Sequence, residues 1–392
     1  MVPKGWSSVQ AQDVCKSISV GVVIKPTQYY VREGYGVKAF RSANVREGFI
    51  NDSDWVYFSH EGHAINKKSH LKTGDVLIVR TGYPGTACVV TPEFEGSNAI
   101  DIVIARPDMD KIIPEYLCAY TNSHIGKSQV LDLQGGMAQK HLNVGAYQVL
   151  KINLPPLREQ KKIAQILLTW DNAISVTEKL LTNSQQQKKA LMQQLLTGKK
   201  RLLDENGVRF SGEWRNSTLS MFCNIAKGKA LSASDLEVGD FPVIAGGKSS
   251  PYSHSDYTHE NVVTVSASGA YAGYISYHNY KIWASDCSVV SAKADNLIDY
   301  FYQLLLSLQD KIYSLQSGGA QPHIYPKDLN SIPLWVPCVK EQQKIAAVLS
   351  AADAEISTLE KKLACLRDEK KALMQQLLTG KRRVKVDEAV AE

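Results

Sequence analysis

The segment His60-Glu61-Gly62-His63 is a first group of residues in this sequence that could do chemistry. Two histidines bind zinc from one helix face when three residues separate them, but only two residues separate this pair. The spacing therefore argues against a metal site. The segment is interpreted as a polar surface loop, with a position close to phosphate as the alternative.

Two Gly-Lys-Ser triplets could belong to phosphate-binding loops, at residues 126–128 and 247–249. Such a loop needs another glycine five residues before its last glycine, and Thr121 and Pro242 stand there. Pro155-Pro156 lies between two leucines, so it also lacks the polar and aromatic neighbours that amino-methyltransferases use. The sequence offers no active site, and we expect no catalytic residue, no metal ligand and no cofactor bound by this chain.

Side chains that could hydrogen-bond base edges lie beside glycine-rich turns in both halves of the sequence. Gln139 and His141 follow a glycine pair, and Gln321 and His323 follow another. Sequence-specific DNA reading needs such donors and acceptors on loops that fit a groove. A repeated structural turn is the alternative. The candidate DNA contacts are Arg80, Tyr83, Gln139, Lys140 and His141 in the first half, and Lys248, Ser268, Tyr271, Gln321 and His323 in the second.

The elements that must position these residues are duplicated within the chain. Residues 188–199 recur without change as residues 370–381, and Glu159-Gln160 matches Glu341-Gln342 at the same offset of 182. Upstream, Trp6 corresponds to Trp214 at an offset of 208. A twelve-residue identity cannot arise by chance, so the chain alternates two globular modules with two copies of one helical segment.

Both helical segments show apolar residues at alternating four- and three-residue steps. A 4-3 spacing kept over about five heptads predicts a coiled coil, and one face of an ordinary helix bundle is the alternative. Each helix is expected to begin after prolines and to end at Gly198 or Gly380. About 40 residues would span roughly 60 Å. The predicted core positions are Ile163, Leu167, Trp170, Ile174, Leu181, Leu191, Leu195, Ile345, Leu349, Ile356, Leu359, Leu363, Leu373 and Leu377.

The globular segments predict mixed modules. Residues 74–80 and 261–266 are expected to be strands that run into glycine turns, and residues 114–122 and 297–308 are expected to be helical. The fold class is therefore α+β, with two globular α/β domains and two long helices that pair as an antiparallel coiled coil. The expected domains are 1–154, 155–203, 204–336, 337–385 and a tail at 386–392.

Composition is that of a globular protein, with 44% hydrophobic and 21% charged residues among 392. Seven cysteines without a close pair argue against disulfides and structural zinc. No segment is expected to span a membrane or to act as a signal peptide, so the expected compartment is the cytoplasm. The net charge of +6 permits a polyanionic partner. Basic clusters at residues 161–162, 199–201 and 381–383 could pair with phosphates or complement the helix dipoles, and both interpretations stay open.

The layout resembles the specificity subunit of type I restriction–modification enzymes over essentially the whole chain. The resemblance rests on Pro155 to Ala164 at the opening of the first helix, on Leu195 to Lys199 at its end, and on the Gly-x-Ala-Gln-x-His run before each helix. The second copy, which begins at Pro337, departs slightly at its opening.

The resemblance implies two target-recognition domains that each read one half of a bipartite double-stranded DNA site, with the paired helices setting the gap. It further implies methyltransferase subunits, two in number, that use S-adenosylmethionine. It also implies restriction and translocase subunits that use ATP and Mg²⁺. None of these cofactors would bind this chain.

Three other interpretations stay open. A coiled-coil assembly protein would explain the helices, but not the matched Gln-x-His turns. An enzyme with an unfamiliar site would need an acid–base or metal group that both copies share, and none is found. An orphan or inactive specificity subunit would belong to the same family but would not direct methylation or restriction.

Overall fold

The computed structural model describes residues 2–133, 141–248, 250, 252–319 and 321–386. The chain divides into two compact units, of which unit 1 is Met1–Glu178 with Lys362–Glu392 and unit 2 is Lys179–Lys361. Each unit contains one globular module together with part of both long helices. A compact unit is therefore not one continuous stretch of sequence.

Unit 1 is a mixed α/β module with the strand orders β2-β11-β8-β9, β10-β4-β7-β3, β1-β12 and β5-β6. Its strands are β1 (Ser7–Gln10), β2 (Cys15–Val20), β3 (Tyr30–Val31), β4 (Gly36–Phe40), β5 (Val45–Arg46), β6 (Phe49–Ile50), β7 (Val56–Ser59), β8 (Val76–Val79), β9 (Ala87–Val89), β10 (Asn98–Ala99), β11 (Ile102–Pro107) and β12 (Lys151–Leu154). Its shorter helices are α1 (Ala11–Val14), α2 (His60–Ile65), α3 (Pro114–Asn122), α4 (His124–Leu133) and α5 (Val144–Gln148).

Unit 2 repeats this plan with the strand orders β14-β20-β17-β18, β16-β15-β19 and β13-β21. Its strands are β13 (Arg215–Thr218), β14 (Cys223–Lys227), β15 (Phe241–Ile244), β16 (Ser253–His254), β17 (Val262–Ser266), β18 (Ile275–His278), β19 (Trp283–Ala284), β20 (Cys287–Ala292) and β21 (Pro333–Val336). Its shorter helices are α7 (Leu219–Phe222), α8 (Ile298–Ser307), α9 (Gln309–Tyr313) and α10 (Pro326–Asn330).

The central sheet of each unit, β2-β11-β8-β9 in unit 1 and β14-β20-β17-β18 in unit 2, contains the strands and turns expected from the sequence. In β8 all four residues are buried, and in β17 all five are, which is why both read as continuous apolar runs. The predicted helix at 114–122 is α3, and the one at 297–308 is α8. Both central sheets are antiparallel throughout, with the same order of equivalent strands. The duplication seen in the helices therefore extends to the topology of the modules.

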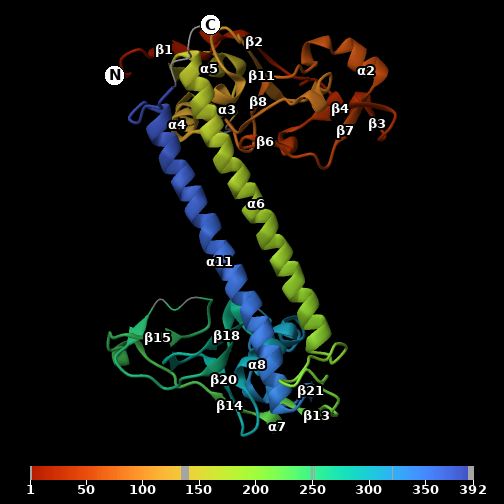
Figure 1. Ribbon diagram of the computed structural model, residues 1–392, viewed down its shortest axis with the longest axis vertical. Coiled ribbons are helices and arrows are strands. Elements are labelled where there is room, and N and C mark those ends of the chain that lie inside the picture. Colours follow the sequence, from red (N-terminus) through yellow and green to blue (C-terminus); the bar gives the residue numbers. More distant parts are fainter. Residues whose placement is uncertain (1, 134–140, 249, 251, 320, 387–392) are drawn as a thin grey trace. The chain divides into compact units, whose positions relative to one another are not determined.

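The long helices are α6 (Leu157–Leu195) and α11 (Val339–Leu378), of 39 and 40 residues (Figure 1). Both end before a glycine with positive φ, 72° at Gly198 and 68° at Gly380, a conformation that favours glycine and stops a helix. The predicted starts and ends are thus confirmed.

Within each unit the two helices are antiparallel. In unit 1 Arg367 pairs with Glu178 and Lys370 pairs with Asp171, and in unit 2 Lys188 pairs with Asp353. As the residue number rises on one helix it falls on the other. All fourteen predicted core positions are buried or half-buried. The helical pairing predicted from the 4-3 spacing agrees with these contacts.

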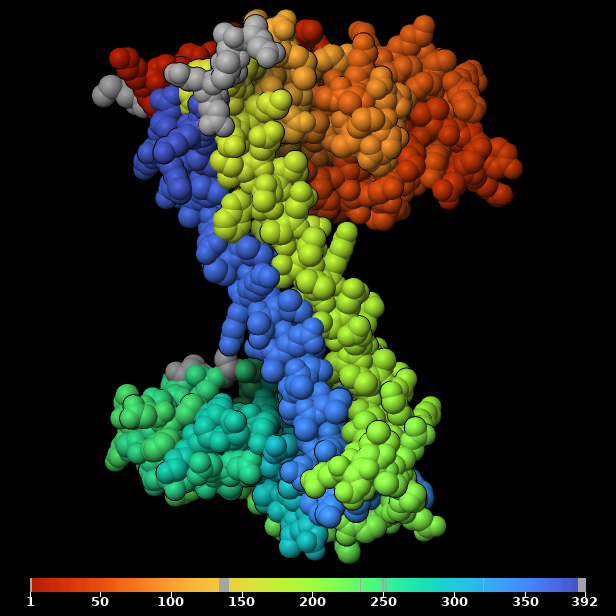
Figure 2. All heavy atoms as spheres, in the orientation of Figure 1, coloured from red at the N-terminus to blue at the C-terminus, as the bar shows by residue number. Residues whose placement is uncertain are grey.

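The helix ends belong to the cores of the modules. Ile163, Leu167 and Leu377 join the core of unit 1, while Leu195, Ile345 and Leu349 join that of unit 2. Figure 2 shows the first part of α6 in contact with the globular module of unit 1. Each module is therefore packed onto the start of one helix and the end of the other.

From its middle onward, α6 carries polar residues at core positions. Thr177 is 3% exposed, Ser184 9% and Lys188 8%. The Lys188 ammonium donates to Asp353, at 2.5 Å, and Asp353 also accepts from Gln303 at 2.7 Å. A buried lysine needs such partners, and polar core positions of this kind fix the register of paired helices.

Two neighbouring leucines of α6 provide a direct test of this packing. Leu167 is 2% exposed, whereas Leu168 is 53% exposed. Leu167→Ala should lower the free energy of unfolding by about 2–5 kcal/mol because it leaves a cavity in the core of unit 1. Leu168→Ala should change it by about 0.5 kcal/mol or less. Urea unfolding of the full chain measures both, and equal losses would contradict the assigned face of the helix.

Among the described residues, no helix has the length and apolar character needed to cross a membrane.

Candidate nucleic-acid interface

The loop between β8 and β9 presents an exposed tyrosine in unit 1. Gly82 and Gly85 have φ values of 90° and 85°, and the Gly85 amide donates to the Val79 carbonyl at 3.0 Å. Residues with side chains rarely adopt such φ values, so the glycines are what let the chain turn here. Tyr83 at the tip is 83% exposed.

The loop between β17 and β18 has the same construction in unit 2. Gly269 and Gly273 have φ values of 78° and 89°, and the Gly273 amide donates to the Ser266 carbonyl at 2.8 Å. Tyr271 in this loop is 42% exposed. Both units thus hold an accessible aromatic ring between two left-handed glycines.

The histidine of each Gln-x-His run lies against the corresponding turn. His141 forms an isolated antiparallel bridge with Thr81, and His323 forms one with Ser268. In unit 1 the Thr81 hydroxyl also lies 2.9 Å from His141 Nδ1. The structure therefore brings together, in each unit, residues that stand about 60 positions apart in sequence. Gln139 and Lys140 lie outside the described residues.

Arg80 occupies an internal network. It is 9% exposed, and its Nε donates to the Leu142 carbonyl at 3.0 Å. Its two terminal nitrogens contact Asp101 and the His141 ring. All three guanidinium nitrogens are used, so the geometry redirects Arg80 from contacting bases to joining the turn to the histidine. Sequence reasoning missed Asp101, because only the fold brings it to this arginine.

The other predicted DNA contacts lie in unit 2, and only some of their side chains are already engaged in contacts within the protein. The Ser268 hydroxyl donates to Asp286, so this side chain is also engaged. Gln321 is exposed. The Lys248 ammonium lies over the rings of Tyr271 and Tyr274, 5.3 and 5.5 Å from their centres, and no carboxylate among the described residues neutralises it. Lys248, Tyr271 and Gln321 therefore remain candidates to face a ligand, together with the half-buried His323.

The buried thiols and histidines around these loops are unsuited to catalysis. Burial raises the pKa of the Cys287 thiol to about 12, with a further contribution from Asp286, so the reactive thiolate is suppressed. Burial lowers the pKa of His278 to about 4, which keeps its ring neutral beside Thr264. No group of three metal-ligating side chains occurs in the part of the chain that the structure describes.

The segment 60–63 is a helix, not the loop expected from sequence. Ser59 caps α2 by accepting from the Gly62 amide at 3.0 Å. The His63 ring stacks on His70 with centres 3.8 Å apart, and its Nδ1 lies 2.6 Å from Asn98 Oδ1. His63 and His70 thus pack against each other within unit 1.

Two of the basic residues after the helices are ion-paired within their units. Arg201 donates to Glu341 through Nε at 2.6 Å and through Nη2 at 2.7 Å. Arg383 makes the same pair of bonds with Glu159. Neither arginine is available to phosphate while these bonds persist. The sequence left open whether these basic residues contact phosphate or complement the helix dipole. For Arg201 and Arg383 the structure shows a third role, which is an ion pair with a glutamate of the other long helix.

Each unit thus presents an exposed tyrosine between two left-handed glycines, with a histidine from a distant part of the sequence bridged to the same turn. This repeated arrangement, together with the duplicated fold, defines a class of protein with two equivalent candidate recognition surfaces.

Comparisons with known proteins agree with this class. Residues 3–183 and 211–366 match the family described as the type I restriction modification DNA specificity domain. The chain is 26% identical to the MjaX type I restriction enzyme specificity subunit assigned in Methanocaldococcus jannaschii, over 98% of this chain and 95% of that protein. It is 25% identical to the MjaVIII specificity subunit of the same organism, over 98% and 94%.

Solved structures show the same fold. The S subunit of a type I restriction–modification system from M. genitalium superposes with a TM-score of 0.67 at 16% identity, covering 96% of both chains. A chain from a study of complex assembly in a type I system gives 0.56 at 18% identity, covering 97% of this chain and 100% of that one.

The chain belongs to the type I restriction–modification specificity family. It is a DNA-recognition subunit and not an enzyme.

Proposed function

We propose that this chain reads a two-part DNA sequence, with unit 1 recognising one half and unit 2 the other. The observation that carries the proposal is the duplicated arrangement of glycine turn, tyrosine and bridged histidine. The scaffold is the same in both units, whereas the turns differ in sequence and length, with Gly82-Tyr83-Pro84-Gly85 in one and Gly269-Ala270-Tyr271-Ala272-Gly273 in the other. Equivalent loops with different side chains are what two different half-sites require.

The proposed recognition domains and spacers have the boundaries expected from the sequence. Residues 1–154 and 204–336 are the recognition domains, and residues 155–203 and 337–385 are the helical spacers. Both α6 and α11 contribute residues to unit 1 and to unit 2, which supports their assignment as the spacer. The candidate contacts to double-stranded DNA are Tyr83, Gln139 and Lys140 in unit 1, and Lys248, Tyr271, Gln321 and His323 in unit 2. His141 has both ring nitrogens engaged by Arg80 and Thr81, so its proposed role is to position the turn.

The proposed partners supply the chemistry. Two DNA adenine methyltransferase subunits, which use S-adenosylmethionine, would methylate the recognised site. Restriction and translocase subunits, which use ATP and Mg²⁺, would cleave unmodified DNA. Membership of a type I specificity family supports such an assembly, and this chain would bind none of these cofactors. The compartment proposed for it is the cytoplasm, where the DNA substrate lies.

Co-expression with its methyltransferase subunit, followed by single-molecule sequencing of host DNA, tests recognition. We expect methylated adenine in a new two-part motif with a constant gap. A stable complex without a motif would indicate an orphan or inactive subunit. Failure to form any complex would favour the assembly-protein interpretation.

DNA binding by the complex should weaken steeply with salt. Each phosphate neutralised by lysine or arginine releases counterions, so the logarithm of affinity falls with that of salt by about 0.9 per contact. Titration of labelled duplex between about 50 and 200 mM salt measures the slope. A protein-binding module would instead show little DNA affinity at any of these concentrations.

A further inference from the structure

The hairpin formed by β5 and β6 places an arginine beside the glycine turn of unit 1. A groove of about 540 Å³ lies between the two, and it is lined by Ser42, Arg46, Thr81, Gly82 and Tyr83 among others. Arg46 and the exposed Tyr83 ring thus share one groove. Arg46 was not among the candidates taken from the sequence.

The guanidinium of Arg46 is held at one nitrogen and free at the others. Nη1 donates to the Val45 carbonyl at 3.0 Å and to the Ser42 carbonyl at 3.4 Å. Neither Nε nor Nη2 has a hydrogen-bond partner among the described residues, and the side chain is exposed. The Nε–Nη2 edge is therefore a planar two-donor fork whose orientation is set by the main chain.

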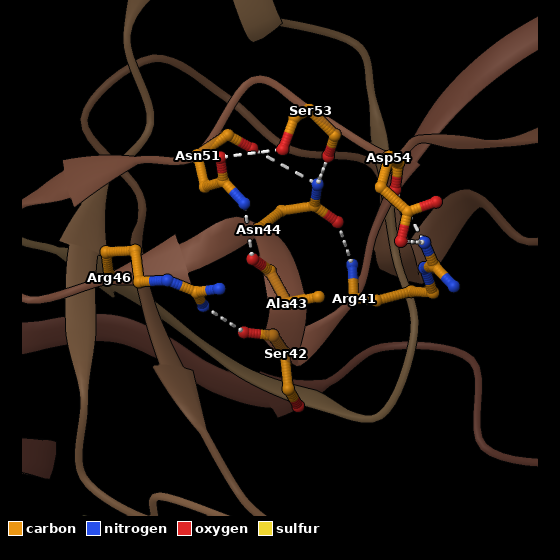
Figure 3. Close-up of polar contacts among 8 residues, drawn as sticks. All are labelled: Arg41, Ser42, Ala43, Asn44, Arg46, Asn51, Ser53 and Asp54. Atoms are coloured by element: carbon orange, nitrogen blue, oxygen red, sulfur yellow. Dashed lines mark hydrogen bonds and ion pairs between the residues drawn. The ribbon is translucent and has the colours of Figure 1, made fainter. Parts of the chain in front are cut away.

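Figure 3 shows the network that holds the main chain behind this fork. Asn44, which is fully buried, donates to the carbonyls of Asn51 and Ser53, at 3.2 and 3.0 Å. Its own carbonyl accepts from the Arg41 amide at 2.9 Å. These bonds join the 3₁₀ turn Ser42–Asn44, which leads into β5 (Val45–Arg46), to the chain that follows β6.

The tip of the hairpin is anchored as well. The Gly48 amide donates to the Ala87 carbonyl at 2.9 Å, and Glu47 pairs with Lys127 of α4. The hairpin is thus held on both sides of Arg46. A donor group positioned in advance loses less entropy on binding than a free surface arginine does.

Unit 2 presents a cation at the equivalent place. The parallel pair β4 with β10 in unit 1 corresponds to β15 with β19 in unit 2. Arg46 follows β4, and Lys248 follows β15 and lies over the Tyr271 ring. Each unit therefore sets a cation from this segment beside the tyrosine of its glycine turn, although the two sequences here share no pattern.

We propose that the Nε–Nη2 fork of Arg46 binds the O6 and N7 acceptors of one guanine in the half-site read by unit 1. A planar arginine fork matches this pair of acceptors, whereas a lysine presents a single point charge. The inference rests on the proposed DNA-reading function and adds a specificity-determining residue to it.

The test compares Arg46→Ala, Arg46→Lys and wild type in the complex with the methyltransferase subunit. Arg32→Ala is the matched control, because it removes the same charge from an exposed arginine of unit 1 that has no side-chain partner among the described residues. Duplexes carry the wild-type motif or single base-pair changes in either half. Thermal unfolding checks that all variants fold.

We expect both Arg46 variants to lose about tenfold to hundredfold in discrimination at one G·C pair of one half-site. Discrimination in the other half and in Arg32→Ala should be unchanged. Uniform weakening on all sequences, or full discrimination by Arg46→Lys, would mean a phosphate contact and would overturn the inference. Unchanged binding by Arg46→Ala would overturn it too. A wild-type complex without any motif would instead refute the proposed function itself.

Discussion

Replacing Glu341 by alanine is expected to lower the free energy of unfolding of unit 2 by about 3–5 kcal/mol. The Glu341 side chain is fully buried, takes two hydrogen bonds from Arg201, and accepts a third from Trp214 Nε1 at 3.3 Å. Its removal leaves a partly buried guanidinium without a counter-ion and an indole N–H without an acceptor. Denaturant unfolding of the full chain measures the loss.

The pair Arg367–Glu178 is the control for this prediction. Its side chains are 58% and 46% exposed, so Arg367→Ala should cost about 1 kcal/mol or less. A double-mutant cycle with Arg201→Ala then separates the coupling of the buried pair from the cost of each truncation. A loss at Glu341 as small as the control's would show that water replaces the Glu341 carboxylate beside Arg201 at little cost.

Inserting seven residues into each long helix is expected to lengthen the unread gap of the DNA target by about three base pairs. Seven residues add ~10.5 Å of helix, against ~3.4 Å per base pair. The insertions go after Glu178 in α6 and after Lys361 in α11, where the chain passes between units. They therefore leave the ion pairs within each unit intact and preserve the 4-3 spacing.

Sequencing of methylated host DNA measures the new gap. An insertion in α6 alone is the control, because it moves Lys188 two turns further from Asp171, so that the two residues cannot both keep their partners on an unchanged α11. That variant should lose stability and methylation. A double insertion that methylates the original motif with the original gap would refute the idea that the helices set the spacing.

The long helices and their pairing could be predicted from the sequence by itself. A repeat of identical residues and a 4-3 apolar spacing are local, periodic signals, and prolines and glycines mark the ends. The start of α6 after Pro155-Pro156 and the turn at Gly198 follow from those signals alone. The strands β8 and β17 were predictable for the same reason, since each is one uninterrupted apolar run.

The composition of each recognition surface was decided only by the tertiary structure. Arg80 stood next to a glycine turn and looked free, but the fold brings Asp101 and His141 to its guanidinium. Arg46 carried no sequence signal, because its place beside Tyr83 depends on a groove between two segments more than 30 residues apart. The sequence gives only a weak indication of this hairpin, which is the glycine at the end of Asn44-Val45-Arg46-Glu47-Gly48.

For the charged residues too, the sequence reveals the basic clusters, whereas only the tertiary structure reveals their partners. Sequence shows that residues 199–201 and 381–383 are basic, but not that Arg201 and Arg383 reach Glu341 and Glu159. These partners stand 140 and 224 residues away, on the other long helix. Periodicity reports which face of a helix is apolar, because that depends on neighbours within a few turns. Whether a charged side chain meets a partner or solvent depends on chain segments that only folding brings together.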